Sequence, residues 1–319
     1  MEAVSEHVAA FRRFSRYFTR RIGALDDHYL GQHRPLGEAR LLFEIGDGVP
    51  LRELRARLGL DAGYLSRMAK ALHAQGMVRL SVHPGDNRLR MIELTPAGRV
   101  EVEEQNRRAD ALVRGMLDGL TPAQRARLTE AMNSTERLLR LAGITVERVD
   151  GASPDARATL AAYAAELDER FPEGFDATDL VRPQEVSGDA GAFFVAYEDG
   201  RPVGCGGLRR LAPGVGEIKH VWVHRGARRL GLARRILAEL EREAVARGFD
   251  AVRLDTHSVL TEARAMYRAA GYTEIPAYAE HVYAGHWFER RLRRTGWPPA
   301  GPTRPSPPPT WPAARRSGG

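Results

Sequence analysis

"RGARRLGLARR", from Arg225 to Arg235, connects a predicted strand to a predicted helix and contains no acidic residue. An apolar run typical of a β-strand, "EIKHVWVH" (217–224), precedes it, and a run typical of an amphipathic helix, "LARRILAELEREAVARG" (232–248), begins within it. A glycine-containing turn at the start of a helix presents free backbone N–H groups at the positive end of the helix dipole. The pattern therefore favours a small phosphorylated ligand over the backbone of a nucleic acid.

Within this stretch, residues 228–233 match the pattern R-x-x-G-x-A. Gly231 permits a close backbone approach, so the N–H groups of 229–233 can point at a pyrophosphate. A Rossmann-type dinucleotide site would need G-x-G-x-x-G, which "GARRLG" (226–231) does not supply. The sequence predicts a pyrophosphate-binding loop formed by Arg228, Arg229, Leu230, Gly231, Leu232 and Ala233.

The whole chain, 319 residues long, is expected to form two domains. Its 43% apolar and 28% charged residues are typical of a soluble globular protein, and its net charge of +7 is compatible with an anionic partner. The single cysteine, Cys205, excludes an internal disulfide and a multi-cysteine metal site, and we expect no metal. Without a signal-like N-terminus or a run of about 18 apolar residues, the chain is expected to be cytoplasmic, with no membrane partner.

The first 142 residues are predicted to be mostly helical. In "PLRELRARLGLDAGYLSRMAKALHAQGMV" (50–78), the apolar spacing predicts two short helices, with Asp61 as the N-cap of the second. A charged hairpin is expected around Pro84–Asn87. The predicted outward side chains of the second helix, together with the hairpin tip, are suited to contact DNA: Tyr64, Ser66, Arg67, Lys70 and Arg88.

The motifs "LDAGYLSRMAKALHAQGMV" (60–78) and "GDNRLRMIELTPAGR" (85–99), with long flanking helices, resemble the MarR family of transcriptional regulators. The resemblance covers about residues 5–142. It implies a winged helix-turn-helix domain, a homodimer built from the first and last helices, and a palindromic site on double-stranded DNA. It also implies that DNA is contacted through Tyr64, Ser66, Arg67 and the wing residue Arg88.

After Gly143 the pattern changes to alternating strands and helices. "ITVERV" (144–149) is predicted to be a strand and "SPDARATLAAYAAELDERF" (153–171) a helix, and a hairpin is expected to turn at Asp199-Gly200. Three further strands and two helices complete an α+β unit that ends near residue 295. The proline- and glycine-rich segment 296–319 is typical of a disordered tail.

The strand "EIKHVWVH", the loop "RRLGLA" and the pattern "AxxxYRxxGY" (263–272) resemble the GNAT family of acyl-CoA-dependent N-acetyltransferases. The resemblance spans about 144–294 and implies a domain with a mixed sheet that binds acetyl-CoA. Together the two resemblances predict a multidomain protein: a mostly α winged helix domain at 1–142, a GNAT domain at 144–295 and a tail at 296–319.

Acetyl transfer to an amine needs a proton acceptor, a donor to the developing oxyanion and an acid for the departing thiolate. The GNAT motif assigns the acid to Tyr267. Glu217, at the head of the strand, is our predicted base, and His220 and His257 are alternatives. Backbone N–H groups of Val221, Trp222 and Val223 are expected beside the acetyl group, and His257 is expected to face the cofactor.

The acceptor is expected to be a small primary amine in an enclosed pocket lined by Phe171, Phe175, Tyr278, His281 and Trp287. Two main functions remain open, and a protein-lysine acetyltransferase guided to DNA by the first domain is a variant of the first. One is a bifunctional DNA-binding regulator and N-acetyltransferase. The other is a transcriptional regulator whose GNAT domain senses acyl-CoA or another ligand without catalysis, and the intact Tyr267 favours the first.

Overall fold

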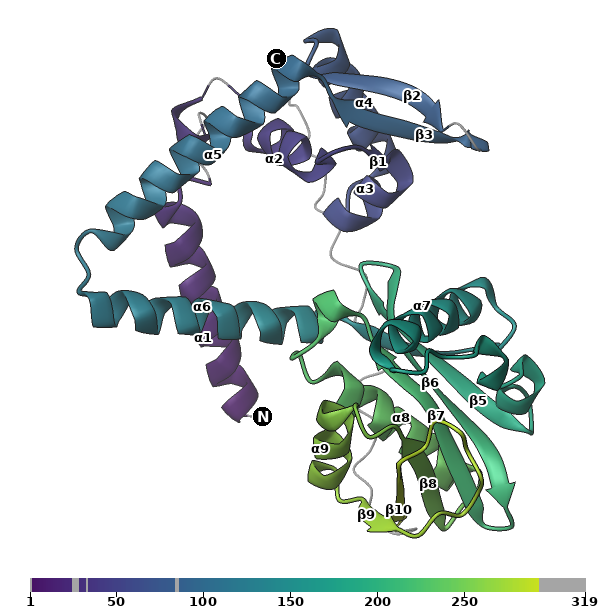
Figure 1. Ribbon diagram of the computed structural model, residues 1–319. Coiled ribbons are helices and arrows are strands. Elements are labelled where there is room, and N and C mark those ends of the chain that lie inside the picture. Colours follow the sequence, from purple (N-terminus) through teal and green to yellow (C-terminus); the bar gives the residue numbers. More distant parts are fainter. Residues whose placement is uncertain (1, 25–28, 33, 84–85, 293–319) are drawn as a thin grey trace. The chain divides into compact units, whose positions relative to one another are not determined.

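The computed structural model describes residues 2–24, 29–32, 34–83 and 86–292 (Figure 1). The chain divides into two compact units, Met1–Ala131 and Met132–Gly319. This division falls inside helix α6 (Pro122–Gly143), whereas the predicted boundary lies at the end of that helix. The predicted tail, 296–319, lies outside the described residues.

The first unit is mostly helical and carries a small antiparallel sheet with the strand order β1-β3-β2. Its elements in chain order are α1 (Glu2–Arg21), η1 (Tyr29–Gly31), α2 (Leu36–Ile45), β1 (Val49–Pro50), α3 (Leu51–Leu58), α4 (Ala62–Ala74), β2 (Val78–His83), β3 (Asp86–Leu94), α5 (Pro96–Leu117) and the start of α6. The predicted hairpin is therefore present as β2 and β3, although the tip residues 84–85 lie outside the described part.

Helix α4 forms where the spacing of apolar residues predicts it. The Asp61 carboxylate accepts hydrogen bonds from the backbone N–H of Gly63 (2.9 Å) and Tyr64 (3.1 Å), which confirms the predicted N-cap. These hydrogen bonds also lower the pKa of Asp61. Leu65 and Leu72 on its inner face are buried in the core of the unit.

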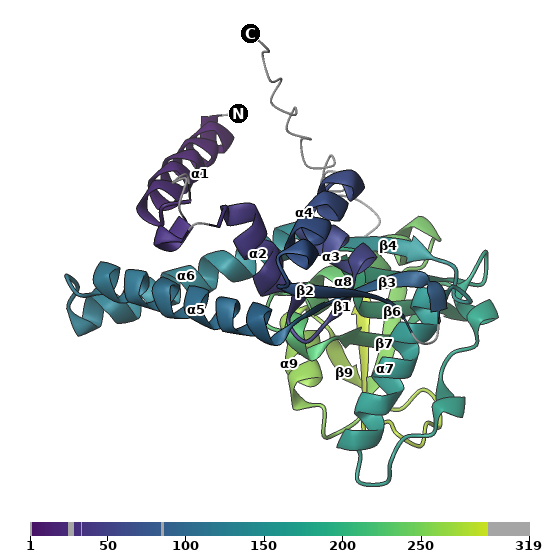
Figure 2. The same cartoon turned by 90° about the horizontal axis from the view of Figure 1, so that it is seen from above.

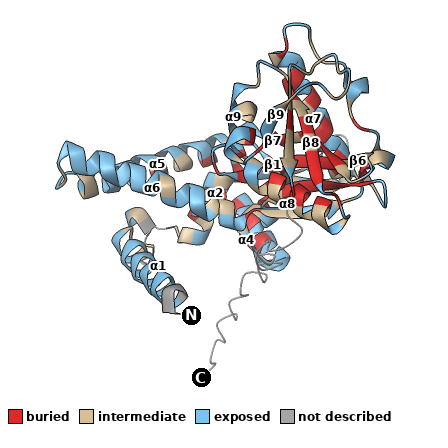
Figure 3. Ribbon diagram, turned by 90° about the horizontal axis from the view of Figure 1, so that it is seen from below, coloured by how far each residue is buried: buried red, intermediate tan, exposed pale blue. Residues whose placement is uncertain are grey.

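Large apolar side chains are exposed along three long helices of the chain, which are coloured mainly as exposed in Figure 3. They lie on α1, α5 and α6: Val8, Phe11, Phe14, Tyr17, Phe18, Val100, Leu112, Val113, Leu128, Met132, Leu138 and Leu139.

Two glycines of helix α5 give a matched test of the packing in this unit. A Cβ at Gly98 would lie 2.1 Å from the Met77 carbonyl oxygen, whereas a Cβ at Gly115 would meet nothing within 4 Å. Gly98→Ala is expected to lower the free energy of unfolding by about 1–3 kcal/mol through overpacking. Gly115→Ala is expected to raise it by about 0.5–1 kcal/mol because alanine favours a helix.

Urea denaturation of the two variants and the wild type measures this difference. If Gly98→Ala proves as stable as the wild type, the close packing of α5 on the turn before β2 is wrong.

The second unit is built on a seven-stranded mixed sheet with the order β4-β5-β6-β7-β8-β10-β9. After the end of α6, its elements are β4 (Thr145–Val149), α7 (Pro154–Arg170), η2 (Ala177–Asp179), η3 (Pro183–Val186), β5 (Gly191–Glu198), β6 (Arg201–Ala212), β7 (Val215–Val223), η4 (Arg225–Ala227), α8 (Leu232–Ala246), β8 (Ala251–Thr256), α9 (Thr261–Ala269), β9 (Thr273–Ile275) and β10 (His286–Arg291). The mostly helical first part and the mixed sheet of the second confirm the coarse prediction.

Helices cover both faces of this sheet (Figure 2). Phe194 and Ala196 of β5 pack on the face covered by α8, and the alternate residues Phe193 and Val195 pack on the face covered by α7. Successive side chains of a strand point to opposite faces, so this alternation defines a three-layer arrangement. Cys205 of β6 is buried on the α7 face, and its burial raises the pKa of the thiol to about 12.

The last turn of α6 packs within the second unit. The Arg140 guanidinium forms two hydrogen bonds with the Glu198 carboxylate, at 2.7 and 2.8 Å. The Arg235 guanidinium of α8 donates to the carbonyl oxygens of Leu141 (3.0 Å) and Ile144 (2.7 Å). Arg235 therefore binds the carbonyl group of Leu141, one of those that the end of a helix leaves without helical partners, and that of Ile144 just beyond the helix.

In the part of the chain that the structure describes, no helix is both long enough and apolar enough to cross a membrane.

Candidate functional site

The candidate site lies where strands β7 and β8 separate. The two strands are parallel, and within the described residues they pair only where Val215–Glu217 faces Ala251–Arg253. Strand β7 continues to Val223 and β8 to Thr256, so their carboxyl ends diverge. Openings at the carboxyl ends of parallel strands are common ligand sites. Two neighbouring cavities border this opening.

The larger cavity has a volume of about 870 Å³, within the range of cofactor sites. It extends between α7, the end of β7, the turn before α8, and α9. Most of the predicted cofactor-binding residues line it: Val221, Trp222, Val223, Arg228, Arg229, Gly231, Leu232 and Ala233. Leu230 does not line it, because its side chain is buried in the core.

The turn before α8 has two residues with positive φ. Gly231 has a φ of 86° and is the N-cap of the helix, and Arg229 has a φ of 62°. A non-glycine residue in this region costs about 1–3 kcal/mol, and such strain is often found at functional sites. Among the described residues, no protein atom accepts a hydrogen bond from the backbone N–H groups of 229–234. These groups are therefore available to an anion in the larger cavity.

Arg228 stabilises this turn from the side. Its guanidinium donates to both carboxylate oxygens of Glu166 in α7 and to the carbonyl oxygen of Val223. The indole Nε1 of Trp222 donates to the same carboxylate at 2.9 Å. Burial raises the pKa of Glu166, but the hydrogen bonds from Arg228 and Trp222 outweigh this effect and lower it overall. Anion binding by the turn would therefore depend on its backbone more than on Arg228.

Tyr267 of α9 lies where the two cavities meet, because it lines both of them. Its side chain is 6% exposed, and its ring packs against those of Tyr272 and Phe288, with ring centres 5.8 and 5.9 Å away. Burial raises the pKa of its hydroxyl above the ordinary tyrosine value, with a further contribution from Asp255. The hydroxyl is therefore protonated at neutral pH and can act as a proton donor.

The smaller cavity, about 70 Å³, adjoins the larger one and is bordered by aromatic rings. Phe171 and Phe175 line it, as predicted for the acceptor pocket, with ring centres 6.0 Å apart. Tyr283 packs 4.9 Å from Phe175, and its hydroxyl accepts a hydrogen bond from the backbone N–H of Asp176. The residues common to both cavities are Tyr163, Leu167, Val221, Leu260, Ala263 and Tyr267.

In each of the two histidines that line the smaller cavity, one ring nitrogen accepts a hydrogen bond from the backbone. His257 Nδ1 accepts from the backbone N–H of Val259 (3.1 Å), so Nε2 carries the proton and donates to Glu173 (3.1 Å). His220 Nε2 accepts from the backbone N–H of Val181 (3.0 Å). The structure therefore brings His257 to the smaller cavity and not to the cofactor loop. Neither neutral ring has a free lone pair for a proton.

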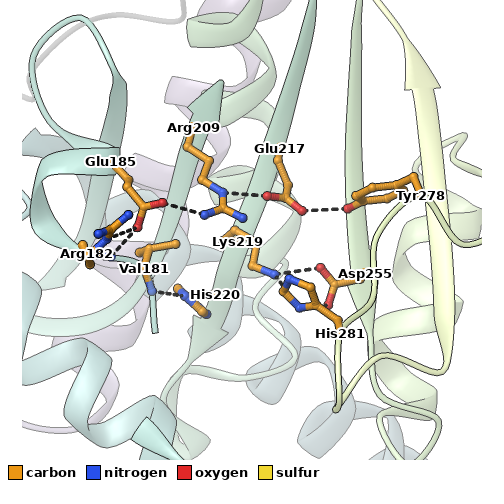
Figure 4. A network of polar contacts seen from close by, with 10 residues as sticks. All are labelled: Val181, Arg182, Glu185, Arg209, Glu217, Lys219, His220, Asp255, Tyr278 and His281. Atoms are coloured by element: carbon orange, nitrogen blue, oxygen red, sulfur yellow. Dashed lines mark hydrogen bonds and ion pairs between the residues drawn. The ribbon is translucent and has the colours of Figure 1, made fainter. Parts of the chain in front are cut away.

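Glu217 belongs to a chain of polar contacts that crosses the sheet (Figure 4). Its carboxylate is 1% exposed, accepts from Arg209 Nε (2.6 Å) and from the Tyr278 hydroxyl (2.9 Å), and lines neither cavity. Burial and the nearby Glu217 and Asp255 carboxylates raise the pKa of Tyr278. Tyr278 was predicted to contact the substrate, but its hydroxyl binds Glu217 and its side chain does not line the cavity. The role of Glu217 as the base stays a prediction.

The buried Lys219 and the partly buried Asp255 form an ion pair at the smaller cavity, with 2.8 Å between Lys219 Nζ and Asp255 Oδ1. His281 contacts this pair, and its Nδ1 lies 3.4 Å from Lys219 Nζ. Trp287 of β10 pairs in register with Asp255, and its indole Nε1 is buried without a partner in the described structure. His281 and Trp287 do not line either cavity.

Sequence reasoning missed several residues that line the cavities. Four lie on one face of α7 at helical spacing, so the periodicity of "YAAELDER" would have revealed them: Tyr163, Glu166, Leu167 and Arg170. Lys219 also had a signal, because it is a charged residue in the middle of an apolar strand. Asp255 had none, since its role depends on the position of β8 beside β7.

In the first unit, α4 presents the predicted DNA-contacting residues on its exposed face, opposite the buried Leu65 and Leu72. These residues are Tyr64, Ser66, Arg67 and Lys70. Arg88 lies in β3, but its side chain is outside the described part of the structure.

Two diverging parallel strands, an anion-accessible turn and two joined cavities are compatible with transfer of a group from a phosphorylated donor to a second substrate. The sequence model described as "Acetyltransferase (GNAT) family" matches residues 159–272. The chain belongs to this family through its second unit.

Similar proteins of known sequence fall into two groups. The chain is 30% identical over 112 residues to the uncharacterized N-acetyltransferase YsnE of Bacillus subtilis (strain 168). The aligned segment covers 34% of the chain and 72% of YsnE. It is 36% identical over 83 residues to an IAA acetyltransferase of Azospirillum brasilense, covering 26% of the chain and 54% of that protein. The uncharacterized HTH-type transcriptional regulator YdgJ of B. subtilis (strain 168) is 26% identical over 95 residues, 30% of the chain and 58% of that protein.

Proposed function

We propose that this protein is both an acetyl-CoA-dependent N-acetyltransferase acting on a small primary amine and a DNA-binding transcriptional regulator. The observation that carries the first activity is the position of Tyr267, a buried and protonated hydroxyl where the larger and smaller cavities meet. An acetyl donor in the larger cavity and an amine acceptor in the smaller cavity would react beside this hydroxyl.

Acetyl-CoA fits the larger cavity in size and in charge. It would supply an acetyl thioester, and its pyrophosphate would lie against the free backbone N–H groups of 229–233. Arg229 and Gly231 have positive φ, a conformation found in turns whose successive N–H groups form an anion-binding nest. Leu260, Ala263 and Met266 give the cavity an apolar wall suited to the pantetheine arm.

The reaction needs three groups from the chain. Tyr267 would donate the proton of its hydroxyl to the departing thiolate, and backbone N–H groups at Val221–Val223 would stabilise the negative charge that develops on the acetyl oxygen. The amine must give up a proton. Glu217 retains lone pairs that Arg209 and Tyr278 do not occupy, so we propose that it receives this proton through a chain of water molecules.

A turnover assay tests the enzymatic proposal. The full chain is mixed with acetyl-CoA and a panel of primary amines, and release of the CoA thiol is followed together with the mass of the product. Acetylation of at least one amine, with saturation by acetyl-CoA, is the expected result.

Binding of acetyl-CoA without acetylation of any amine would contradict the enzymatic proposal and favour the ligand-sensor function. Acetyl-CoA should then change the affinity for operator DNA, and DNA should change the affinity for acetyl-CoA by the same factor.

The DNA-binding proposal rests on helix α4 and on the similarity to an HTH-type regulator. A polar and basic exposed face over a buried apolar face is what a recognition helix requires. We propose that Tyr64, Ser66, Arg67, Lys70 and Arg88 contact a palindromic site on double-stranded DNA. The exposed apolar residues of α1, α5 and α6 would be covered by a second copy of the chain in a homodimer.

Arg67→Ala is expected to weaken binding to operator DNA by about 1–3 kcal/mol if the guanidinium contacts a base. Binding of the wild type should also weaken steeply with salt, because phosphate contacts release counterions. Fluorescence anisotropy with a labelled operator, selected from a genomic library, measures both effects.

Arg291→Ala is a matched control, since it removes one exposed cation from β10 of the second unit. Equal losses in the two variants would mean that Arg67 acts only through net charge. Failure of the full chain to retain any fragment of the library at low salt would contradict DNA binding.

A further inference from the structure

Strand β7 departs from the alternation of side chains at residue 220. Ile218 packs in the core on the α8 face, so Lys219 points to the opposite face, where it reaches Asp255. His220 should then point back toward α8. Instead its φ is 56°, the register with β6 shifts between Cys205 and Gly207, and its ring lies on the α7 face, 5.2 Å from that of Tyr163. This β-bulge brings two consecutive side chains to the same side of the sheet.

Both side chains reach the smaller cavity and can donate hydrogen bonds there. Lys219 is 7% exposed, and its ammonium has three N–H groups. One points to Asp255 Oδ1 and a second to His281 Nδ1, which leaves a third without a partner in the described structure. A buried cation with an N–H to spare is suited to an anionic oxygen.

His220 supplies a second donor with a fixed tautomer. Because Nε2 accepts the hydrogen bond from Val181, the proton of the neutral ring is on Nδ1. Burial lowers the pKa of His220 to about 3, helped by the positive charges of Lys219 and Arg209, so the ring stays neutral at physiological pH. The structure gives Nδ1 no partner among the described residues. The ring can therefore donate to a ligand but cannot accept its proton.

We propose that Lys219 and His220 bind a carboxylate of the acceptor, and that the acceptor is an amino acid with an apolar or aromatic side chain. A charged N–H and a neutral N–H that border the same cavity match the two oxygens of a carboxylate. The aromatic rings of Tyr163, Phe171 and Phe175 border the same cavity and suit an apolar side chain. This inference rests on the proposed acetyltransferase function, whose donor site lies in the other cavity.

Pairs of amines that differ only in the carboxylate test the proposal. L-Phenylalanine is compared with phenethylamine, and L-leucine with 3-methylbutan-1-amine, by kcat/KM for acetylation by the full-length protein. We expect the amino acid of each pair to be favoured by about 10- to 100-fold, which is the usual effect of a charge-assisted hydrogen bond.

Two variants remove the donors with little change in volume. Lys219→Met combined with Asp255→Asn removes the cation without leaving its partner charged, and His220→Leu removes the ring N–H at a similar volume. In both, the preference for the carboxylate should fall at least about 10-fold, and in the first it should approach unity. The quantity compared between proteins is the ratio of kcat/KM for the amino acid to that for the matching amine. Differences in amine basicity affect this ratio equally in every protein, so they cancel. None of these residues lines the larger cavity, so unchanged affinity for acetyl-CoA shows that the variants are folded.

Arg291→Met, which removes an exposed cation of β10, is the matched control and should keep the wild-type preference. Equal kcat/KM for the two members of each pair, or a preference that survives both variants, would overturn the proposal while leaving the acetyltransferase function intact.

If no amine is acetylated, calorimetry of L-phenylalanine and phenethylamine with the CoA-saturated protein gives a separate answer. Binding that requires the carboxylate and Lys219 would support the inference although the enzymatic proposal has failed. Binding that ignores the carboxylate, or no binding of either molecule, would overturn it.

Discussion

Tyr267→Phe is expected to slow the acetyl-transfer step by about 10²–10⁴-fold, the usual effect of losing a general acid. Phenylalanine keeps the ring that packs against Tyr272 and Phe288, so the affinity for acetyl-CoA should change little. Single-turnover kinetics with a confirmed amine substrate measures the chemical step, and calorimetry measures the affinity.

The pH dependence gives a second readout for Tyr267. Burial raises the pKa of this hydroxyl, so the acid stays protonated as the pH rises and is lost only above the ordinary tyrosine value of about 10. The wild-type rate should therefore hold into alkaline solution and fall at higher pH as Tyr267 ionises. That high-pH limb should be absent from Tyr267→Phe.

Tyr272→Phe is the matched control for this experiment. Its ring lies beside that of Tyr267, but its hydroxyl donates to Glu241 and it lines neither cavity. This variant should keep the wild-type rate and pH profile even if it is less stable. A Tyr267→Phe variant with near-normal turnover would mean that Tyr267 serves only in packing.

Gly231→Asp is expected to reduce the affinity for acetyl-CoA by at least about 100-fold. Space is not the obstacle, because a Cβ at Gly231 would meet only Leu141 Cδ2, at 3.9 Å. The φ of 86° adds strain of about 1–3 kcal/mol, and a carboxylate about 4 Å from a phosphate adds about 1–4 kcal/mol of repulsion.

Gly231→Asn separates these two effects, since asparagine has the same shape, tolerates positive φ and carries no charge. We expect calorimetry to find a modest loss for Asn and a much larger loss for Asp. If the aspartate variant binds acetyl-CoA as tightly as the wild type, the pyrophosphate lies elsewhere.

The elements around the site were predictable because local signals agree. The apolar run 217–224 and the periodic run from Leu232 predicted β7 and α8. The predicted turn at Asp199-Gly200 connects β5 and β6, and these two residues have φ values of 50° and 77°. Turn residues and hydrophobic spacing act within a few positions of the chain, so a single sequence is enough to reveal them.

The chemistry of the smaller cavity was not predictable in the same way. The bulge at His220 depends on pairing with β6, and the partners of Lys219 and Glu166 come from β8 and the turn before α8. Tyr278, His281 and Trp287 lie in the expected region, but the register of β10 and the loop before it direct them away from the cavity. Contacts between distant segments decide these positions, and local pattern contains no information about them.

The hydrogen bonds from Arg235 to the end of α6 determine where the second unit can be cut for transfer into another protein. A gene fragment that starts at residue 144 would omit the Leu141 side chain beside Gly231 and one of the two carbonyl groups that hold Arg235. It would also omit Arg140 and its bonds to Glu198. A transplant that begins no later than Met132, where the second compact unit begins, would retain all of these contacts.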